Sequence, residues 1–327
     1  MRKALNLLML LALFMVPLLS ACGGGEIKDN SVGNDSEKDS GTKKHKIGIL
    51  APAVTHGWVA AVAYHAEAHA KELSDEIEYQ VQTSTNAEEM TSQLDDLMTW
   101  GAESIVAFPQ WEGMEVPIQT ALDAGIKVVN FDIEIGTEGV YRVSGNNEDM
   151  GIQGANYIVE KIGNEGNVVV LEVPSSGSVS GLRKKGFVET MEKIAPDMNL
   201  LTYATKFTRE DGLKDFADIL TSNDKIDAVF SMDDETSIGV LQAISEAGRT
   251  DVQVVTGGGM QEYFKMMPEN EDIWIQSALY SPAMVKDAVD VALKLLNGEE
   301  VEQVTIIPTT VVDRENHEEF LDGNSPY

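Results

Sequence analysis

The sequence has few cysteines, few basic residues and few histidines. Cys22 is the only cysteine among 327 residues, which excludes an intramolecular disulfide and a cysteine-based metal site. Lysine and arginine number 24 against 54 aspartates and glutamates, so the formal net charge is −30. A surface of this charge repels nucleic acid and anionic lipid. We therefore expect no nucleic-acid partner, and we expect no metal and no cofactor.

One long apolar run stands near the start of the chain. Two basic residues, 2–3, precede the apolar run 5–19, and small residues then lead to Cys22. This order is typical of a secretory signal peptide. The sequence Leu-Ser-Ala-Cys at 19–22 also resembles the lipobox of bacterial lipoproteins, in which the cysteine is acylated, the chain is cut just before it, and the cysteine becomes the new N-terminus. We therefore predict a signal peptide over 1–21 and a lipid on Cys22.

Residues 22–44 contain glycine, serine, aspartate, asparagine and lysine and almost nothing apolar. Such a segment cannot bury a core, so we expect a flexible tether. No later run is long and apolar enough for a transmembrane helix. The remainder is therefore expected to fold outside the membrane and to contact it only through the lipid anchor.

From residue 45 onward, short apolar runs alternate with helical stretches. In the stretch 86–100, Met90, Leu94 and Leu97 recur at helical spacing, and Asn86 is a candidate N-cap. Apolar runs separated by helices of roughly ten to fifteen residues are typical of buried parallel sheets. Two such series predict an α/β fold with two doubly wound lobes.

Ligands of such sheets bind beyond the carboxyl ends of the strands, so the residues that follow each expected strand form the candidate site. They are polar groups and flat aromatics: His56, Trp58, Gln110, Trp111, Asp132, Glu134, Asn146, Asn147, Arg183, Phe207, Asp233, Asp234 and Tyr280. Carboxylates, amides and arginine bind hydroxyls in pairs, and an aromatic face covers the C–H side of a sugar ring. Each residue alone could instead cap a helix, as Asp233 could. The recurrence favours a polyol site.

Four stretches resemble the type I periplasmic solute-binding proteins of ABC importers, in the ribose- and galactose-binding group. They are GANYIVEKI, GLRKKGF, AVFSMDDETSIGVLQAISEAG and VKDAVDVALKLLNGE. The resemblance runs from Lys46 to about Val312 and implies two Rossmann-like lobes that are joined by a three-strand hinge and close on one small ligand. We accordingly place lobe one in 45–146 plus 281–305, and lobe two in 147–280 plus 306–322.

The resemblance also implies ligand contacts from both lobes, at His56, Trp58, Asp132, Arg183, Phe207, Asp233 and Tyr280. The chain departs from the family pattern at several of these positions. Ile133 stands where the family has an arginine, and Gly258 where it has a second carboxylate. Tyr280, or Leu279 without an alignment gap, stands where the family has a glutamine. These changes argue against ribose and glucose and leave another sugar, polyol or similar polar ligand.

The resemblance implies a binding protein that delivers a sugar or polyol to an ABC permease in the membrane. No nucleophile–base pair stands out in the sequence, so we expect no enzymatic activity, and nothing in it suggests more than a monomer. A sensor subunit that presents its ligand to a membrane receptor or sensor kinase is the alternative. Sugar repressors share the fold, but a signal peptide and a tether occupy the place of a DNA-binding head. The charge also argues against DNA binding.

Three further stretches each lack part of a known motif. His65 and His69 lie one helical turn apart without the glutamate spacing of a zinc protease, so we expect an exposed helix face. Val179 replaces the nucleophile of a Gly-x-Ser-x-Gly elbow, so we expect a helix-entry loop beside the cleft. Thr-Gly-Gly-Gly-Met at 256–260 lacks the lysine of a phosphate-binding loop, so we expect a tight turn.

Overall fold

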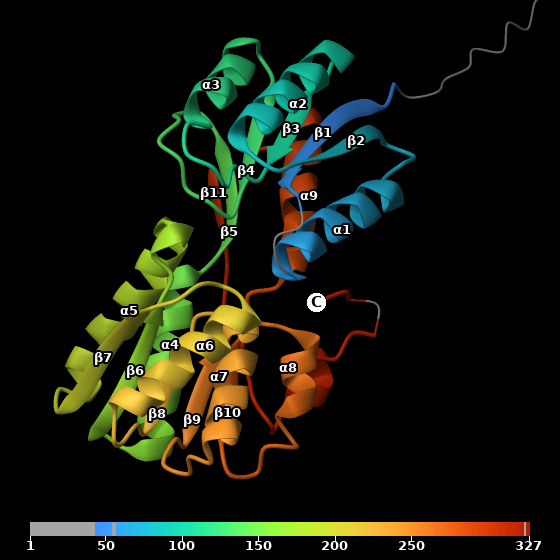
Figure 1. Cartoon of the computed structure of the whole chain (residues 1–327). Coiled ribbons are helices and arrows are strands. Elements are labelled where there is room, and N and C mark those ends of the chain that lie inside the picture. The colour runs from blue at the N-terminus through green and yellow to red at the C-terminus, as the bar shows by residue number, and fades with distance from the viewer. Residues whose placement is uncertain (1–42, 54–56, 324) are drawn as a thin grey trace, which may run out of the picture. The chain divides into compact units, whose positions relative to one another are not determined.

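A computed structural model describes residues 43–53, 57–323 and 325–327 of the chain, within one compact unit that spans residues 42–327. The expected signal peptide, Cys22, the tether up to residue 42 and His56 lie outside the described residues. The unit contains two six-stranded sheets, and each has helices on both of its faces (Figure 1). None of the helices described is long and apolar enough to cross a membrane.

The first sheet is entirely parallel and has the strand order β11-β5-β4-β3-β1-β2. Its strands are β1 (His45–Pro52), β2 (Ile77–Ser84), β3 (Ser104–Ala107), β4 (Lys127–Phe131), β5 (Tyr141–Gly145) and β11 (Val304–Ile307). Its helices are α1 (Gly57–Glu72), α2 (Ala87–Trp100), α3 (Glu115–Asp123) and α9 (Val285–Leu296). Apolar residues of α1 and α9 cover one face of the sheet, and those of α2 and α3 cover the other. We call this assembly lobe one.

The second sheet has the order β12-β10-β9-β8-β6-β7, and all its pairs are parallel except that of β12 with β10. Its strands are β6 (Gly166–Glu172), β7 (Met198–Ala204), β8 (Ala228–Phe230), β9 (Val254–Gly257), β10 (Trp274–Ala278) and β12 (Val311–Val312). Its helices are α4 (Asn147–Ile162), α5 (Ser178–Ile194), α6 (Arg209–Ser222), α7 (Asp234–Ala247) and α8 (Gln261–Met266). Helices α4 and α5 cover one face, and α6, α7 and α8 the other. We call this assembly lobe two.

Local sequence explains why α2 begins and ends where it does. The Asn86 side chain accepts a 2.8 Å hydrogen bond from the backbone N–H of Glu89, so it caps the helix as expected. Gly101, at φ 87°, ends the helix in the left-handed conformation that glycine adopts without steric cost. Between these ends, Met90, Leu94 and Leu97 are buried, which confirms the helical spacing.

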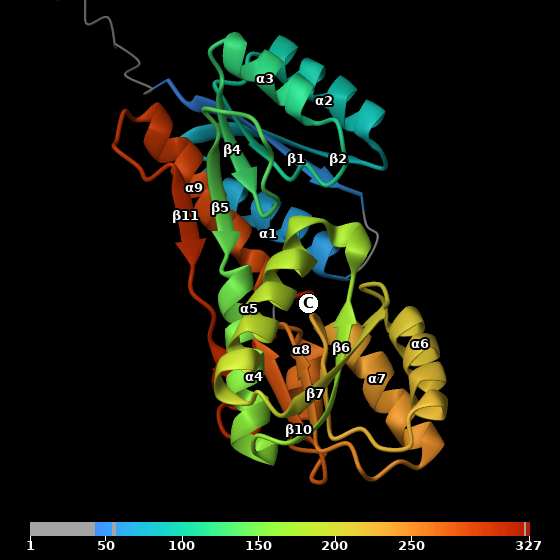
Figure 2. The ribbon, with the colours of Figure 1, turned by 90° about the vertical axis from the view of Figure 1, so that its left-hand side faces the viewer.

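Three chain segments connect the lobes: β5 to α4, β10 to α9, and β11 to β12. Figure 2 shows β11 beside β5, and β5 leading directly into α4. The segments also bond to one another, because Asn146 N–H donates to the carbonyl of Ile307 (2.9 Å) and Leu279 N–H donates to that of Thr310 (2.8 Å). The expected α/β class with two doubly wound lobes and a three-strand hinge is confirmed. The exact lobe boundaries stay a prediction, and the one at 305 falls inside β11.

Candidate functional site

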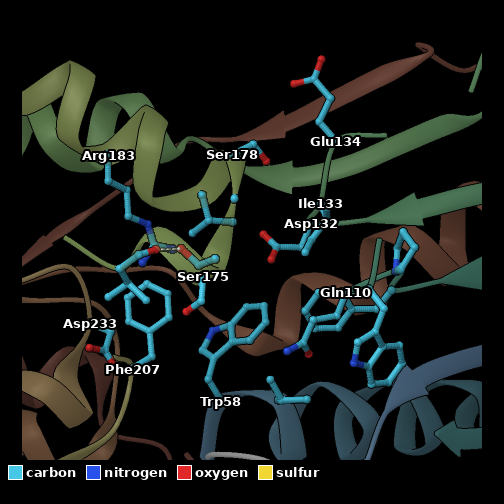
Figure 3. A pocket seen from close by; sticks show the side chains of 18 of the residues that line it. Trp58, Gln110, Asp132, Ile133, Glu134, Ser175, Ser178, Arg183, Phe207 and Asp233 are labelled. Carbon is cyan, nitrogen blue, oxygen red and sulfur yellow. Dashed lines mark hydrogen bonds between the residues drawn. The ribbon is translucent and has the colours of Figure 1, made fainter. Parts of the chain in front are cut away.

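Residues of both lobes line one cavity of about 600 Å³, within the size range of small-ligand sites (Figure 3). Nearly all of its lining follows the carboxyl ends of strands, where parallel sheets bind ligands. Lobe one contributes, among others, Trp58, Gln110, Trp111, Asp132 and Glu134. Lobe two and the segment after β10 contribute Ser175, Ser178, Arg183, Phe207, Asp233, Gly258 and Tyr280. In Figure 3, Arg183 and Phe207 lie across the cavity from Asp132 and Gln110.

Trp58 forms part of the aromatic wall on the lobe one side. It lies in the first turn of α1, and its ring stacks on Phe131 at 6.0 Å and meets the edge of Phe108 at 5.8 Å. Its indole N–H donates a 2.8 Å hydrogen bond to the carbonyl of Tyr280. The ring is therefore held from two sides, by the end of β4 and by the segment that follows β10.

Asp132 directly follows β4 and is the one described non-glycine residue with a positive φ, at 66°. Its side chain is buried, and its carboxylate accepts a hydrogen bond from the Tyr280 hydroxyl. Burial raises the pKa of Asp132, although the Tyr280 hydroxyl and the nearby Arg183 and Arg142 oppose this. The left-handed backbone conformation, which is uncommon outside glycine, aims the carboxylate into the cavity.

Tyr280 lies where the chain crosses between the lobes and joins residues of both. Besides Asp132, its hydroxyl contacts the Ser144 hydroxyl at 3.2 Å and the Asn147 amide, which donates to it at 3.0 Å. Burial raises the pKa of Tyr280, and the Asp132 carboxylate raises it further, so the phenol remains a donor. Gly145 has no side chain where the Tyr280 ring packs, because a Cβ there would overlap the ring.

Arg183 extends from α5 and is buried by contacts on three sides. Its Nε donates to the Asn147 side-chain oxygen at 2.8 Å, and its Nη1 donates to the carbonyl of Met232. Its guanidinium lies 4.4 Å from the Tyr280 ring centre and 5.8 Å from that of Phe207. The planar fork is thus fixed in place at the cavity wall, with donors for a polar ligand.

Asp233 both caps a helix and lines the cavity. Its side chain accepts a 3.2 Å hydrogen bond from Thr236 N–H at the start of α7, so the N-cap role considered from the sequence is confirmed. Burial raises the pKa of Asp233 to about 6, although the bonds from Thr236 and the charge of Arg183 lower it. The carboxyl group therefore changes charge in a mildly acidic solution.

The glycine loop after β9 is filled by a side chain of the protein itself. The buried Asp234 carboxylate accepts hydrogen bonds from the N–H groups of Gly258, Gly259 and Met260. Burial raises the pKa of Asp234 to about 7, although these three bonds oppose the shift. Because the carboxylate occupies the N–H donors, the loop is a braced turn, and the expectation of a tight turn is confirmed.

Seven of the nine expected ligand-binding residues line the cavity: Trp58, Gln110, Asp132, Arg183, Phe207, Asp233 and Tyr280. Asn147 does not line it. This residue is buried at the start of α4, where it positions Arg183 and Tyr280 through its amide. His56 lies outside the described residues.

Sequence reasoning missed several residues at the cavity. Glu112, Glu115, Lys206 and Tyr327 line it, and none of them was singled out from the sequence. The first three lie two to eight residues beyond strand ends, so a wider window after each strand would have found them. Tyr327 follows no strand closely and gave no signal in the sequence. With these two glutamates, the cavity lining has five carboxylates and two cationic groups, Arg183 and Lys206. The carboxylates are those of Glu112, Glu115, Asp132, Glu134 and Asp233.

The two histidines of α1 have structural surroundings. His69 contacts Asp290 at 2.7 Å and Glu72 at 3.1 Å, and these carboxylates raise its pKa against the effect of burial. His65 is buried instead of exposed, because it lies on the face of α1 that packs inward. The expected exposed face is therefore wrong for His65. No cluster of potential metal ligands is present among the described residues.

Comparison with known proteins agrees with this geometry. Residues 47–300 match the family described as periplasmic binding protein domain. The chain is 26% identical to a xylitol-binding protein of Mycolicibacterium smegmatis, covering 93% of this chain and 87% of the relative. It is 23% identical to a ribose import binding protein of Bacillus subtilis, covering 94% and 98%.

Solved structures share the fold. An ABC transporter solute-binding protein of Bacillus halodurans with bound myo-inositol superposes with a TM-score of 0.77 at 21% identity, covering 87% of this chain and 98% of that one. The two doubly wound lobes and the three crossing segments are those that the resemblance implied. The chain therefore belongs to the periplasmic binding protein family, with the fold of the type I solute-binding proteins of ABC importers.

Proposed function

We propose that this chain captures a neutral sugar or polyol between its two lobes and delivers it to an ABC permease. The observation that carries the proposal is the cavity itself, where paired polar groups of both lobes face a wall of aromatic rings. Asp132, Asp233 and Arg183 provide acceptors and donors for hydroxyls, and Trp58 and Phe207 provide flat apolar faces. The names of the relatives, which include xylitol-binding and ribose import proteins, support this ligand class.

The charge of the cavity lining narrows the ligand class. Five carboxylates line the cavity against Arg183 and Lys206. A phosphorylated or acidic sugar would meet an excess of negative charge in a partly desolvated site, where repulsion is strong. A neutral polyol avoids this cost.

Capture would proceed by closure about the three crossing segments. A ligand that touches lobe one through Asp132 and lobe two through Arg183 gains both sets of contacts only when the lobes come together. Tyr280 lies on a crossing segment and bonds to Asp132, so it links the ligand site to the hinge.

The expected lipid anchor completes the proposal. Cys22, the last residue of the lipobox at 19–22, would carry a diacyl lipid. The polar tether that follows would hold the folded part on the outer side of the membrane. Growth with a labelled fatty acid should then label the parent chain, whereas a Cys22→Ser chain should carry no label. A parent chain without label would contradict the anchor.

Ligand binding is tested by thermal shift and calorimetry on residues 43–327 with xylitol, D-ribose, D-allose and myo-inositol, and with ribose 5-phosphate as the anionic control. Tight binding stabilises the folded state by about 2.7 kcal/mol at a ligand concentration 100 times the Kd. Asp132→Ala and Arg183→Ala should abolish the shift, whereas Asp95→Ala, at an exposed position of α2, should retain it. No shift with any of the neutral polyols would overturn the proposed ligand class.

A further inference from the structure

Tyr327 lines the cavity although it lies 47 positions beyond Tyr280, past the last strand. Its side chain is buried, with a residue exposure of 4%. The ring packs against Gly57, the first residue of α1 in lobe one. A Cβ placed on that glycine would lie 2.9 Å from Cδ2 of the ring. The ring thus occupies the space that any larger residue at position 57 would need.

The chain before Tyr327 is attached to lobe two. The Gln261 side chain, at the start of α8, accepts a 2.7 Å hydrogen bond from Asp322 N–H and donates a 3.0 Å bond to the carbonyl of Phe320. The Ser325 hydroxyl donates to the carbonyl of Tyr327 at 2.8 Å, which folds residues 325–327 into a local turn. A segment fixed on lobe two therefore carries an aromatic ring to the first turn of a lobe one helix.

The surroundings of the ring suit a polar ligand. The Glu235 carboxylate, from the first turn of α7, also lies 3.2 Å from the Cβ position of Gly57, so Tyr327 shares this corner with a lobe two acid. Burial raises the pKa of Tyr327 well above its usual value, and Asp233, Asp234 and Glu235 add to this effect. The phenol consequently stays neutral and keeps an O–H donor.

We propose that Tyr327 is a ligand-contacting residue of the cleft and that residues 325–327 bridge lobe two to the start of α1 in lobe one. The ring would cover an apolar face of the bound polyol, while its packing on Gly57 would stabilise the arrangement of the two lobes. This proposal rests on the proposed function for the ligand contact. The packing on Gly57 is independent of any ligand.

The ligand contact is tested by calorimetry with the tightest binder among xylitol, D-ribose, D-allose and myo-inositol. Loss of an aromatic contact is expected to raise Kd about tenfold in Tyr327→Ala, and Tyr327→Phe should retain most of the affinity because it keeps the ring. Tyr64→Ala, at an exposed position of α1 outside the cavity, is the matched control and should bind like the parent. An unchanged Kd in Tyr327→Ala overturns the ligand contact.

The bridge is tested without ligand by a double-mutant cycle in melting temperature. Gly57→Ala forces a methyl group against the Tyr327 ring, so it should lower the melting temperature more in the parent than in the Tyr327→Ala background. If the two substitutions lower the melting temperature additively, the proposed packing of Tyr327 on Gly57 is overturned. A parent that binds no polyol overturns the proposed function and the ligand contact together, while the cycle still decides the bridge.

Discussion

The Tyr280 hydroxyl donates a hydrogen bond to the Asp132 carboxylate, although the two residues are 148 positions apart in the chain. Asp132 directly follows a strand of lobe one, and Tyr280 lies on a segment that crosses between the lobes. The same hydroxyl also accepts a bond from Asn147, which in turn accepts one from Arg183. Hydrogen bonds through Tyr280, at the hinge, and Asn147 therefore connect the Asp132 carboxylate of lobe one with the Arg183 guanidinium of lobe two.

Tyr280→Phe should destabilise the protein and weaken polyol binding. The substitution keeps the ring on Gly145 but leaves the buried Asp132 carboxylate without this donor. An unsatisfied buried acceptor costs about 1–3 kcal/mol. Urea unfolding at neutral pH measures the loss.

Tyr203→Phe is the matched control for this substitution. The Tyr203 hydroxyl bonds only to the Asn223 side chain at 3.1–3.5 Å among the contacts observed, and it lies outside the cavity. Its loss should cost less than half as much and should leave Kd unchanged. Equal effects of the two substitutions would mean that the bond from Tyr280 to Asp132 contributes no more to stability than the bond between Tyr203 and Asn223.

The sequence was sufficient to predict which strand ends form the cavity, because parallel sheets bring the carboxyl ends of their strands to one edge. Trp58, Asp132 and Arg183 were found in this way. The sequence was not sufficient to predict roles that depend on which group a side chain bonds to. The sequence predicted that the Asn147 amide binds the ligand, but in the structure this amide donates to Tyr280 and accepts from Arg183.

Two other features could not be predicted for the same reason. The glycine loop at 256–260 has the composition of an anion site, and only the structure shows that the Asp234 carboxylate occupies its N–H groups. Tyr327 belongs to no periodic pattern and follows no strand, so its place in the cavity depends entirely on tertiary packing.

Arg183→Lys should lower the affinity for polyol despite the conserved charge. Lysine cannot reproduce the planar fork that bonds Asn147 and Met232 while lying on the Tyr280 ring. Loss of a hydrogen bond to a charged group costs about 1.5–3 kcal/mol, which is roughly a ten- to hundredfold rise in Kd. Calorimetry with the tightest binding polyol measures the change.

Lys184→Arg provides the reverse exchange at the next position of α5. Lys184 pairs with Glu172 at 2.5 Å and does not line the cavity, so its exchange should leave Kd unchanged. If Arg183→Lys also bound like the parent, the arginine would act through charge alone.

Asp233→Asn should change how stability depends on pH. The folded-state pKa of Asp233, about 6, lies above the value of roughly 3.9 for an unfolded aspartate. The stability that the neutral carboxyl contributes is therefore fully present below pH of about 4 and is lost as pH rises through about 6. Asparagine keeps a neutral N-cap at all pH values.

The parent should therefore lose on the order of 1–2 kcal/mol relative to Asp233→Asn between pH 4 and 7, after allowance for partial exposure. Urea midpoints of both chains across this range measure the difference, to which Asp234 adds in the same direction, because the Asp233 charge raises the pKa of Asp234 in the parent alone. A constant difference between the two chains would show that Asp233 does not titrate in this range.

Gly186→Ala should disrupt the packing that places Arg183. Helices α4 and α5 approach so closely that a Cβ on Gly186 would overlap the backbone carbonyl of Glu148, which no side-chain rotation can relieve. Forced separation of packed helices costs about 1–3 kcal/mol and would displace Arg183, one turn away on the same helix. We expect a lower urea midpoint and weaker polyol binding.

Gly181→Ala separates this steric effect from helix propensity. Gly181 lies on the same helix, is exposed, and has no atom within 4 Å of its Cβ position. Alanine there should raise stability by roughly 0.5–1 kcal/mol, because glycine is the poorer helix former. Opposite signs for the two substitutions are expected, since only Gly186 faces α4. Stabilisation by both would mean that α5 can move away from α4 at little cost, and that the position of Arg183 does not depend on this contact.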